Sequence, residues 1–425
     1  MTTTLIVLLS VFFVLIVLSV PISYSIGVAS ILALIVKDTI SLQSVPQKFF
    51  SGLDSFTLLA IPLFIFVGDV MVVGGISKRL IALANYCVGW MRGGLAYVTI
   101  VASAFFGAIS GSSVATTSAI GGLMYPEMVA KKYDKSFAAA LGAVGGTLGI
   151  LIPPSIAFII FGTQSGTSVT GLFLTGGVIG IVIMVLYCIA AKVKLSKDTD
   201  VVLEVRTDTS QRGRIIREAS WGLFTPIIIL GGIYTGVFTP TESAIVASVY
   251  SILVGFFVYK ELTIKNLASV LVKSAMTSAV ILFLTGLATL FCWIMTIEGT
   301  SRMLQGFVTS ANINKYVFLL IINLIYLVLG MLMDTIPIII LTTPIFLPIA
   351  VSFGIDPIHF GTITVVNLAF GLFTPPFGVC VFMANTYSKQ PVAGIFSQCR
   401  YFFVFGLIGI FLTTYFPQIY MWVVR

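Results

Sequence analysis

The sequence GILIPP at residues 149–154 recurs 222 residues later as GLFTPP at residues 371–376, and both copies lie in strongly apolar surroundings. A doubled proline in an apolar helix removes main-chain donors and clashes with the preceding turn. In a bilayer the freed carbonyl groups find no water and need other partners. Two such breaks at corresponding positions predict two halves, each with a discontinuous helix, arranged around a site near the membrane midplane.

The composition is that of a polytopic membrane protein. Of 425 residues, 58% are hydrophobic and only 9% are charged, and the mean hydropathy is +1.12. This is too little polar surface to cover a soluble protein of that size. At about 20 residues per crossing, the apolar runs predict roughly ten to twelve spans plus re-entrant pieces. The first run has no basic region before it and no small-residue cleavage site, so a retained helix is expected.

The basic residues lie mainly between apolar runs, so the net charge of +8 indicates membrane orientation and no nucleic-acid partner. The densest group lies in the polar segment 192–217, where acidic residues are mixed with it. We expect this segment to be a cytoplasmic loop that divides the two halves. Lys131, Lys132 and Lys135 mark a second candidate for the cytoplasmic side.

Several classes of chemistry are excluded. His359 is the only histidine, so neither a histidine metal cluster nor a Ser/His/Asp catalytic set near the serine-rich segment is expected. The sequence GxxxxGK[ST] is absent, so the chain has no recognisable means of hydrolysing ATP. We therefore expect a protein that is not an enzyme, and uphill transport by it would use an ion gradient or another subunit.

The duplication extends beyond the proline motif. The same 222-residue offset aligns Ser112 with Asp334, Ser113 with Thr335 and Pro126 with Pro348. The predicted organisation is a first repeat over residues 1–191, the loop 192–217, and a second repeat over residues 218–425. The alignment alone does not decide whether the repeats are inverted or parallel.

Each proline motif has an upstream partner rich in polar or helix-breaking residues. Residues 103–122 read SAFFGAISGSSVATTSAIGG, with SGSS at 110–113 as the expected tip of a helical hairpin. Residues 330–350 contain Asp334 and Thr335 and then Pro337, Pro344 and Pro348. We predict hairpins over about 103–130 and 330–352, and broken helices over about 137–165 and 358–386. Hydroxyl, carboxylate and unwound carbonyl oxygens form a hard ligand set that suits Na⁺.

Structural roles compete with functional ones at several positions. A carboxylate such as Asp334 in an apolar segment is costly unless it is paired or bound to an ion, which favours a function. The hydroxyls of the first tip could instead serve helix packing. Glu242 fits a capping box with Thr239, Arg302 could snorkel to the interface, and the role of Asp69 is left open.

The serine-rich hairpin, GGTLGILIPPS at 145–155 and NLAFGLFTPPFG at 367–378 resemble the large membrane subunit of tripartite ATP-independent periplasmic (TRAP) transporters over essentially the whole chain. The resemblance implies a multi-pass protein of the bacterial inner membrane that imports an organic anion with Na⁺. It also implies an all-α fold with two inverted repeats, two re-entrant hairpins and two broken helices. These would form a transport domain that moves as an elevator against a scaffold.

The family's other components are implied as partners: a periplasmic binding protein that delivers the anion, and a small membrane subunit of about four helices. Because this chain begins directly with the large-subunit pattern, we expect the small subunit to be a separate polypeptide. Overall resemblance favours sialic acid over a C4-dicarboxylate as substrate. A self-sufficient Na⁺/carboxylate symporter and, more remotely, an ion channel are the alternatives.

The resemblance also implies site residues. The first Na⁺ site would use Ser110 and Ser112 with backbone at Gly149, Ile152 and Pro154. The second Na⁺ site would be formed by Asp334, Thr335, Gly371, Thr374 and Pro376. The substrate candidates are Ser113, Thr116 and Arg302.

Overall fold

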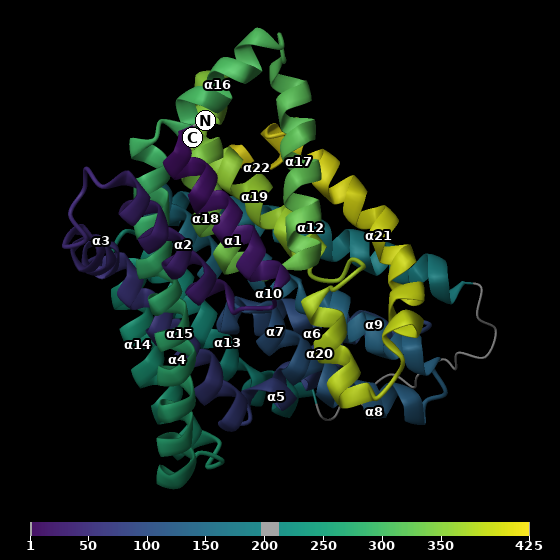
Figure 1. Ribbon diagram of the computed structural model, residues 1–425. Helices are drawn as coiled ribbons and strands as arrows, with labels where there is room; N and C mark the ends of the chain where they lie inside the picture. The colour runs from purple at the N-terminus through teal and green to yellow at the C-terminus, as the bar shows by residue number, and fades with distance from the viewer. Residues whose placement is uncertain (1, 197–211, 425) are drawn as a thin grey trace.

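The computed structural model describes residues 2–196 and 212–424, and its regular elements there are all helices (Figure 1). The first repeat contains α1 (Thr3–Val17), α2 (Ile22–Lys37), α3 (Ser44–Leu53), η1 (Phe56–Leu59), α4 (Ala60–Val73), α5 (Ile76–Val88), α6 (Gly94–Ser110), α7 (Ser113–Thr116), η2 (Thr117–Gly121), α8 (Gly122–Ala130), α9 (Lys135–Gly146), α10 (Leu148–Leu151), α11 (Ile156–Ser165) and α12 (Val169–Leu195). The second repeat contains α13 (Arg212–Tyr234), α14 (Pro240–Leu253), η4 (Val254–Val258), α15 (Ile264–Ile297), α16 (Thr300–Ser310), α17 (Lys315–Leu332), α18 (Thr335–Ser352), α19 (Pro357–Gly371), α20 (Val379–Ser388), α21 (Val392–Tyr415) and α22 (Gln418–Met421).

The helices have the length and surface of a membrane protein. Within the described residues, eight helical segments are long and apolar enough to cross a bilayer, and four further apolar helices are 10–17 residues long. Large apolar side chains such as Phe13 on α1, Val280 on α15 and Leu324 on α17 are exposed. In water such surfaces would be unfavourable, whereas lipid accommodates them.

The two predicted hairpins are present, but both begin earlier than the sequence suggested. The first hairpin rises along α6 from Gly94, turns at Gly111 and Ser112, and returns through α7, η2 and α8. The second rises along α17 from Lys315, turns at Met333 and Asp334, and returns along α18. The predicted starts at 103 and 330 were wrong because the rising helices are apolar and resemble ordinary spans.

Prolines do not interrupt the returning helix of the second hairpin. Pro344 has no N–H for the carbonyl of Ile340, and this oxygen instead accepts a hydrogen bond from Cys292 Sγ on α15, 3.3 Å away. Pro348 likewise frees the carbonyl of Pro344, which accepts from Ser301 Oγ at 3.1 Å. Side chains of neighbouring helices thus replace the missing backbone donors, and α18 continues through both prolines.

The predicted breaks lie at the doubled prolines. In the first broken helix, α10 ends at Leu151 and α11 begins at Ile156; in the second, α19 ends at Gly371 and α20 begins at Val379. The peptide bonds Pro153–Pro154 and Pro375–Pro376 are both cis. The capping box predicted at the start of α14 is confirmed, with Thr239 and Glu242 bonded reciprocally.

The two hairpins enter from opposite ends of the molecule, so the repeats are inverted. Figure 1 shows α8, at the base of the first hairpin, at one end, and α16 and the start of α17, at the base of the second, at the other. Helix α15 runs between these ends with 34 residues, about 51 Å at 1.5 Å per residue.

The two basic segments that were alternative markers of the cytoplasmic side lie at the same end. Lys194 Nζ, near the end of α12, is 5.6 Å from the ring centroid of Phe137, two residues after Lys135. The segment predicted as a loop at 192–217 is helical at both ends, since α12 continues to Leu195 and α13 begins at Arg212. The remainder, 197–211, lies outside the described residues.

Candidate ion site between the hairpin tips

The two hairpin tips and the two helix breaks meet around one small cavity of about 50 Å³. Segments that are some 220 residues apart in sequence therefore face one another. The cavity is lined by Gly111, Ser112, Ser113, Val114, Ile150, Ile156, Ala157, Asp334, Thr335, Ile336 and Leu372. None of these lining residues is basic.

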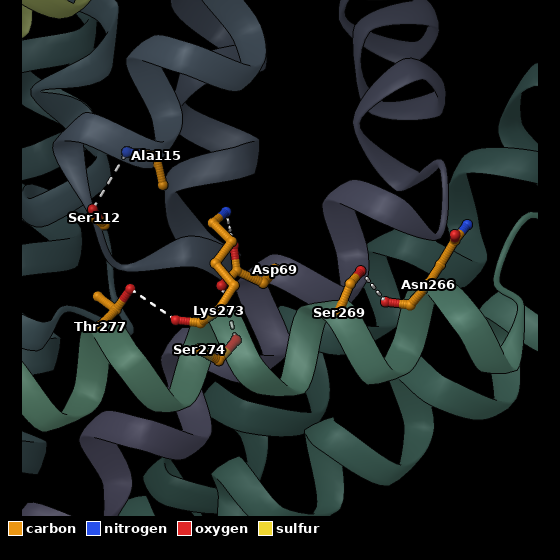
Figure 2. Close-up of polar contacts among 8 residues, drawn as sticks. All are labelled: Asp69, Ser112, Ala115, Asn266, Ser269, Lys273, Ser274 and Thr277. Carbon is orange, nitrogen blue, oxygen red and sulfur yellow. Dashed lines mark hydrogen bonds and ion pairs between the residues drawn. The ribbon is translucent and has the colours of Figure 1, made fainter.

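The hydroxyls of the first tip are bonded mainly within the tip itself. Ser110 Oγ lies 3.0 Å from Thr116 Oγ1, and Thr116 Oγ1 donates to the carbonyl of Ser112 at 2.8 Å. Ser112 caps α7, its Oγ accepting from the N–H of Ala115 at 3.4 Å (Figure 2). Ser113 differs, because its buried Oγ has no hydrogen-bond partner in the described structure. That oxygen is available to a ligand in the cavity.

The first helix break packs directly against this tip. A Cβ atom at Gly149 would lie 2.6 Å from the carbonyl oxygen of Ser112, so only glycine allows this approach. Ile156 N–H donates to the carbonyl of Gly111 at 3.3 Å. Pro154 is adjacent, since a Cβ at Gly111 would lie 2.8 Å from its carbonyl oxygen.

Four of the five residues predicted for the first Na⁺ site are therefore brought together: Ser110, Ser112, Gly149 and Pro154. The fifth, Ile152, is in the same break, and its side chain packs near Gly180 of α12.

The second tip carries a carboxylate, Asp334, at the position that corresponds to Ser112 in the first tip. Asp334 caps α18, and its Oδ1 accepts from the N–H of Thr335 at 2.7 Å. Within the described residues Asp334 forms no ion pair. The buried Thr335 Oγ1 also has no partner there. A carboxylate without an ion pair and a hydroxyl without a hydrogen-bond partner are suitable ligands for a cation.

The second break repeats the close packing of the first. A Cβ at Gly371 would lie 2.8 Å from the carbonyl oxygen of Gly330, so α19 and α17 touch through glycine. Thr374 Oγ1 donates to the carbonyl of Phe370 at 2.8 Å and retains acceptor capacity. Pro376 lies within the break and is exposed. Of the residues predicted for the second Na⁺ site, two therefore lie at the tip and three at the second break.

The three substrate candidates lie in different environments. Ser113 lines the cavity, whereas Thr116 is fully buried beneath the tip and bonded to it. Arg302 is exposed on α16, beside Ser301, which bonds to Pro344. Since Pro344 is nine residues beyond Thr335, about 14 Å along α18, the structure does not bring Arg302 to the cavity.

Sequence reasoning missed two polar supports. Ser155, directly after the first doubled proline, caps α11 and donates to the carbonyl of Ile150 at 2.7 Å, which holds the two sides of the break together. Asn367 on α19 donates to Asn323 on α17 at 2.8 Å. A serine after the break is a cap signal that could have been used; the pairing of two distant asparagines has no local signal.

The size and chemistry of the cavity favour an ion. About 50 Å³ holds a cation with little water, whereas organic ligands need pockets of about 300 Å³ or more. All of the polar atoms at the cavity are oxygens or backbone groups, which suit a hard cation. An organic anion would have to bind at the mouth of this cavity or in a different arrangement of the hairpins.

Inverted repeats with paired hairpins, broken helices and an oxygen-lined site define a secondary transporter. A family model described as "Tripartite ATP-independent periplasmic transporter, DctM component" matches residues 9–419, and the chain belongs to this family. Its relatives include the C4-dicarboxylate TRAP transporter large permease protein of Pseudomonas aeruginosa, 38% identical over 93% of this chain and 92% of that protein. The sialic acid TRAP transporter large permease protein of Vibrio cholerae is 34% identical over 87% of each.

The fold also matches a solved membrane transporter. The crystal structure of the Alcanivorax borkumensis YdaH transporter, described as having an unusual topology, superimposes with a TM-score of 0.66 over 89% of each chain. At 13% identity this similarity concerns the fold alone. Family membership and the apolar helices together make the chain a multi-pass protein of the bacterial inner membrane, and a transporter subunit.

Gly149→Ala is expected to destabilise the protein and weaken ion binding, because the new methyl group would be forced against the backbone of the first tip. Overpacking of this kind costs about 1–3 kcal/mol. Gly122→Ala is the matched control, since a Cβ there would meet nothing within 4 Å. Thermal unfolding of the two purified variants, with and without Na⁺, measures the difference. Equal melting temperatures would show that the tip and the break are not tightly packed.

Proposed function

We propose that this chain is the membrane-embedded transport subunit that carries an organic carboxylate inward together with Na⁺. The observation that carries the proposal is the unpaired Asp334 carboxylate, which lines one cavity with the unpartnered hydroxyls of Ser113 and Thr335. Such a ligand set at two hairpin tips that face two helix breaks is typical of cation sites in secondary transporters.

Na⁺ would couple to the anion through charge. With no basic residue lining the cavity, an incoming carboxylate would meet only the negative charge of Asp334. Bound Na⁺ would neutralise the charge of Asp334, and the positive amino-terminal end of α18 would attract the carboxylate further. Anion binding would then require Na⁺, which prevents transport of the anion alone.

The charge distribution supports one orientation. Lys194, Lys135 and their neighbours lie at one end, and from the positive-inside rule we infer that this end faces the cytoplasm. The first hairpin then enters from the cytoplasm and the second from the periplasm, with both tips meeting between them. Elevator-type movement of the two hairpins would expose their shared cavity alternately to each side.

The substrate is an organic acid anion. Sialic acid, favoured by the initial resemblance, and a C4-dicarboxylate both remain candidates, because the relatives' names include both and the similarity to the C4-dicarboxylate protein is slightly greater. The family's description as tripartite supports two partners, a periplasmic binding protein and a small membrane subunit.

Uptake by the assembled transporter is expected to rise with Na⁺ concentration with a Hill coefficient above one, because two similar oxygen-rich clusters face the cavity. Initial rates of labelled substrate uptake into proteoliposomes test this over a Na⁺ series at constant ionic strength. K⁺ replaces Na⁺ in the control. Uptake unchanged in K⁺ would reject Na⁺ coupling, and a Hill coefficient of one would leave one of the two clusters without an ion.

A further inference from the structure

Three ion pairs connect α15 and its flanking residues to helices of the first repeat, at three positions along the length of α15. One lies just before α15, one about ten residues into it, and one directly after its end. They are Arg79–Glu261 at 2.7 Å, Asp69–Lys273 at 2.7 Å and Lys37–Glu298 at 2.5 Å. The longest described helix is thus fixed to α5, α4 and α2 in turn.

In the middle pair the carboxylate belongs to α4, and both of its oxygens bond to α15. Asp69 Oδ1 accepts from Lys273 Nζ, and Oδ2 accepts from Ser274 Oγ at 2.8 Å, so both carboxylate oxygens are bonded to α15 (Figure 2). The side chain of Asp69 is 14% exposed and that of Lys273 is 70% exposed. Because a largely buried carboxylate in an apolar helix is costly when unpaired, these bonds should fix the rotation of α4 about its own axis.

The residue before Asp69 touches the first hairpin tip. A Cβ at Gly68 would lie 3.1 Å from Ser110 Cα and 3.4 Å from Ser110 Cβ. The last turns of α4 therefore bond to α15 through Asp69 and press against the tip through Gly68. A change in the rotation of α4 would move the surface that covers Ser110, which is only 3% exposed.

We propose that Asp69 is a positioning residue for transport, which with Lys273 and Ser274 holds α4 so that Gly68 forms a smooth contact surface for the first hairpin tip. Because Gly68 has no side chain that could interlock with Ser110, the tip can leave this contact and return to it. This inference rests on the proposed function in one respect, namely that the tip moves during transport. Asp69 is not among the residues that line the cavity.

The test compares Asp69→Ala, Asp69→Asn and Asp69→Glu with Lys37→Ala. Lys37→Ala removes an ion pair to the α15 region at the opposite end, away from the tip, and is the matched control. Asp69→Asn can keep the bond to Ser274 and removes only the charge, so it is the milder of the two variants. Asp69→Glu restores the charge.

The first readout does not require substrate. In a Cys87→Ser background, Ser110→Cys reports how well α4 covers the tip, through its rate of labelling by a maleimide. We expect labelling to rise about tenfold with Asp69→Ala, less with Asp69→Asn, and not with Lys37→Ala. An unchanged rate in folded Asp69→Ala and Asp69→Asn protein would overturn the inference.

The second readout is uptake by the assembled transporter with Ser110 intact. Asp69→Ala should lower the maximal rate about tenfold while the substrate KM and the half-saturating Na⁺ concentration change by less than about twofold, and Asp69→Glu should recover most of the rate. A selective loss of Na⁺ affinity would instead make Asp69 part of an ion site and overturn the positioning role. No uptake by the parent protein would reject the proposed function, while the labelling result would still decide the role of Asp69.

Discussion

Replacing Asp334 by alanine is expected to lower Na⁺-activated uptake by about 100-fold, since a charged ligand contributes on the order of 3 kcal/mol. Asp334 supplies the only acidic side chain among the residues that line the cavity, and it forms no ion pair within the described residues. Folding should suffer much less, because loss of the cap on α18 costs about 1 kcal/mol. Uptake over a Na⁺ series and thermal unfolding of the same preparations measure the two effects.

Asp334→Asn separates charge from capping, because asparagine is also a good helix cap. This variant should melt like the parent protein and still lose Na⁺ activation. Asp54→Ala removes an exposed carboxylate after α3 and is the control for a simple change in net charge. Parent-like Na⁺ dependence in Asp334→Asn would show that the charge is not needed. Equal losses of membrane insertion and uptake in Asp334→Ala would indicate a structural role.

The sequence was most informative where proline, glycine and small residues carry the signal. Both breaks could be predicted because a doubled proline interrupts the hydrogen bonds of a helix, and both tips because polar residues interrupt an otherwise apolar stretch. The pairing of Ser112 with Asp334 followed from the repeat alone, and in the structure each is the cap of a returning helix and lines the shared cavity.

Uniformly apolar segments were less informative. The rising helices of both hairpins read as ordinary spans, so their starts at Gly94 and Lys315 were missed. Pro344 and Pro348 resemble further breaks, yet Cys292 and Ser301 compensate for them from other helices. Compensation by a distant side chain has no local sequence pattern.

Long-range charge pairing could not be derived either. Asp69 stayed open between a structural and a functional role because its partners, Lys273 and Ser274, are more than 200 residues away. Arg302 was a candidate for binding the anion, but it lies on α16 beside Ser301, which bonds to Pro344 on α18 away from the tip. Inversion of the repeats also depends on which end each hairpin enters, which the alignment did not fix.

Uptake is also expected to depend almost entirely on partners. A scaffold must remain fixed while the transport domain moves, and a small membrane subunit packed against this chain would widen that scaffold. A binding protein would supply capture of a scarce solute. Reconstituted alone, the chain should therefore give little or no uptake.

The central claim is tested most directly by uptake into proteoliposomes under an inward Na⁺ gradient, with labelled sialic acid and labelled succinate in parallel. The chain is assayed alone, with the small membrane subunit, and with both that subunit and the substrate-loaded binding protein. We predict uptake only in the complete assembly and only with the Na⁺ gradient, for one of the two anions. Robust uptake of free substrate by the chain alone would contradict the tripartite assignment and identify a self-sufficient symporter.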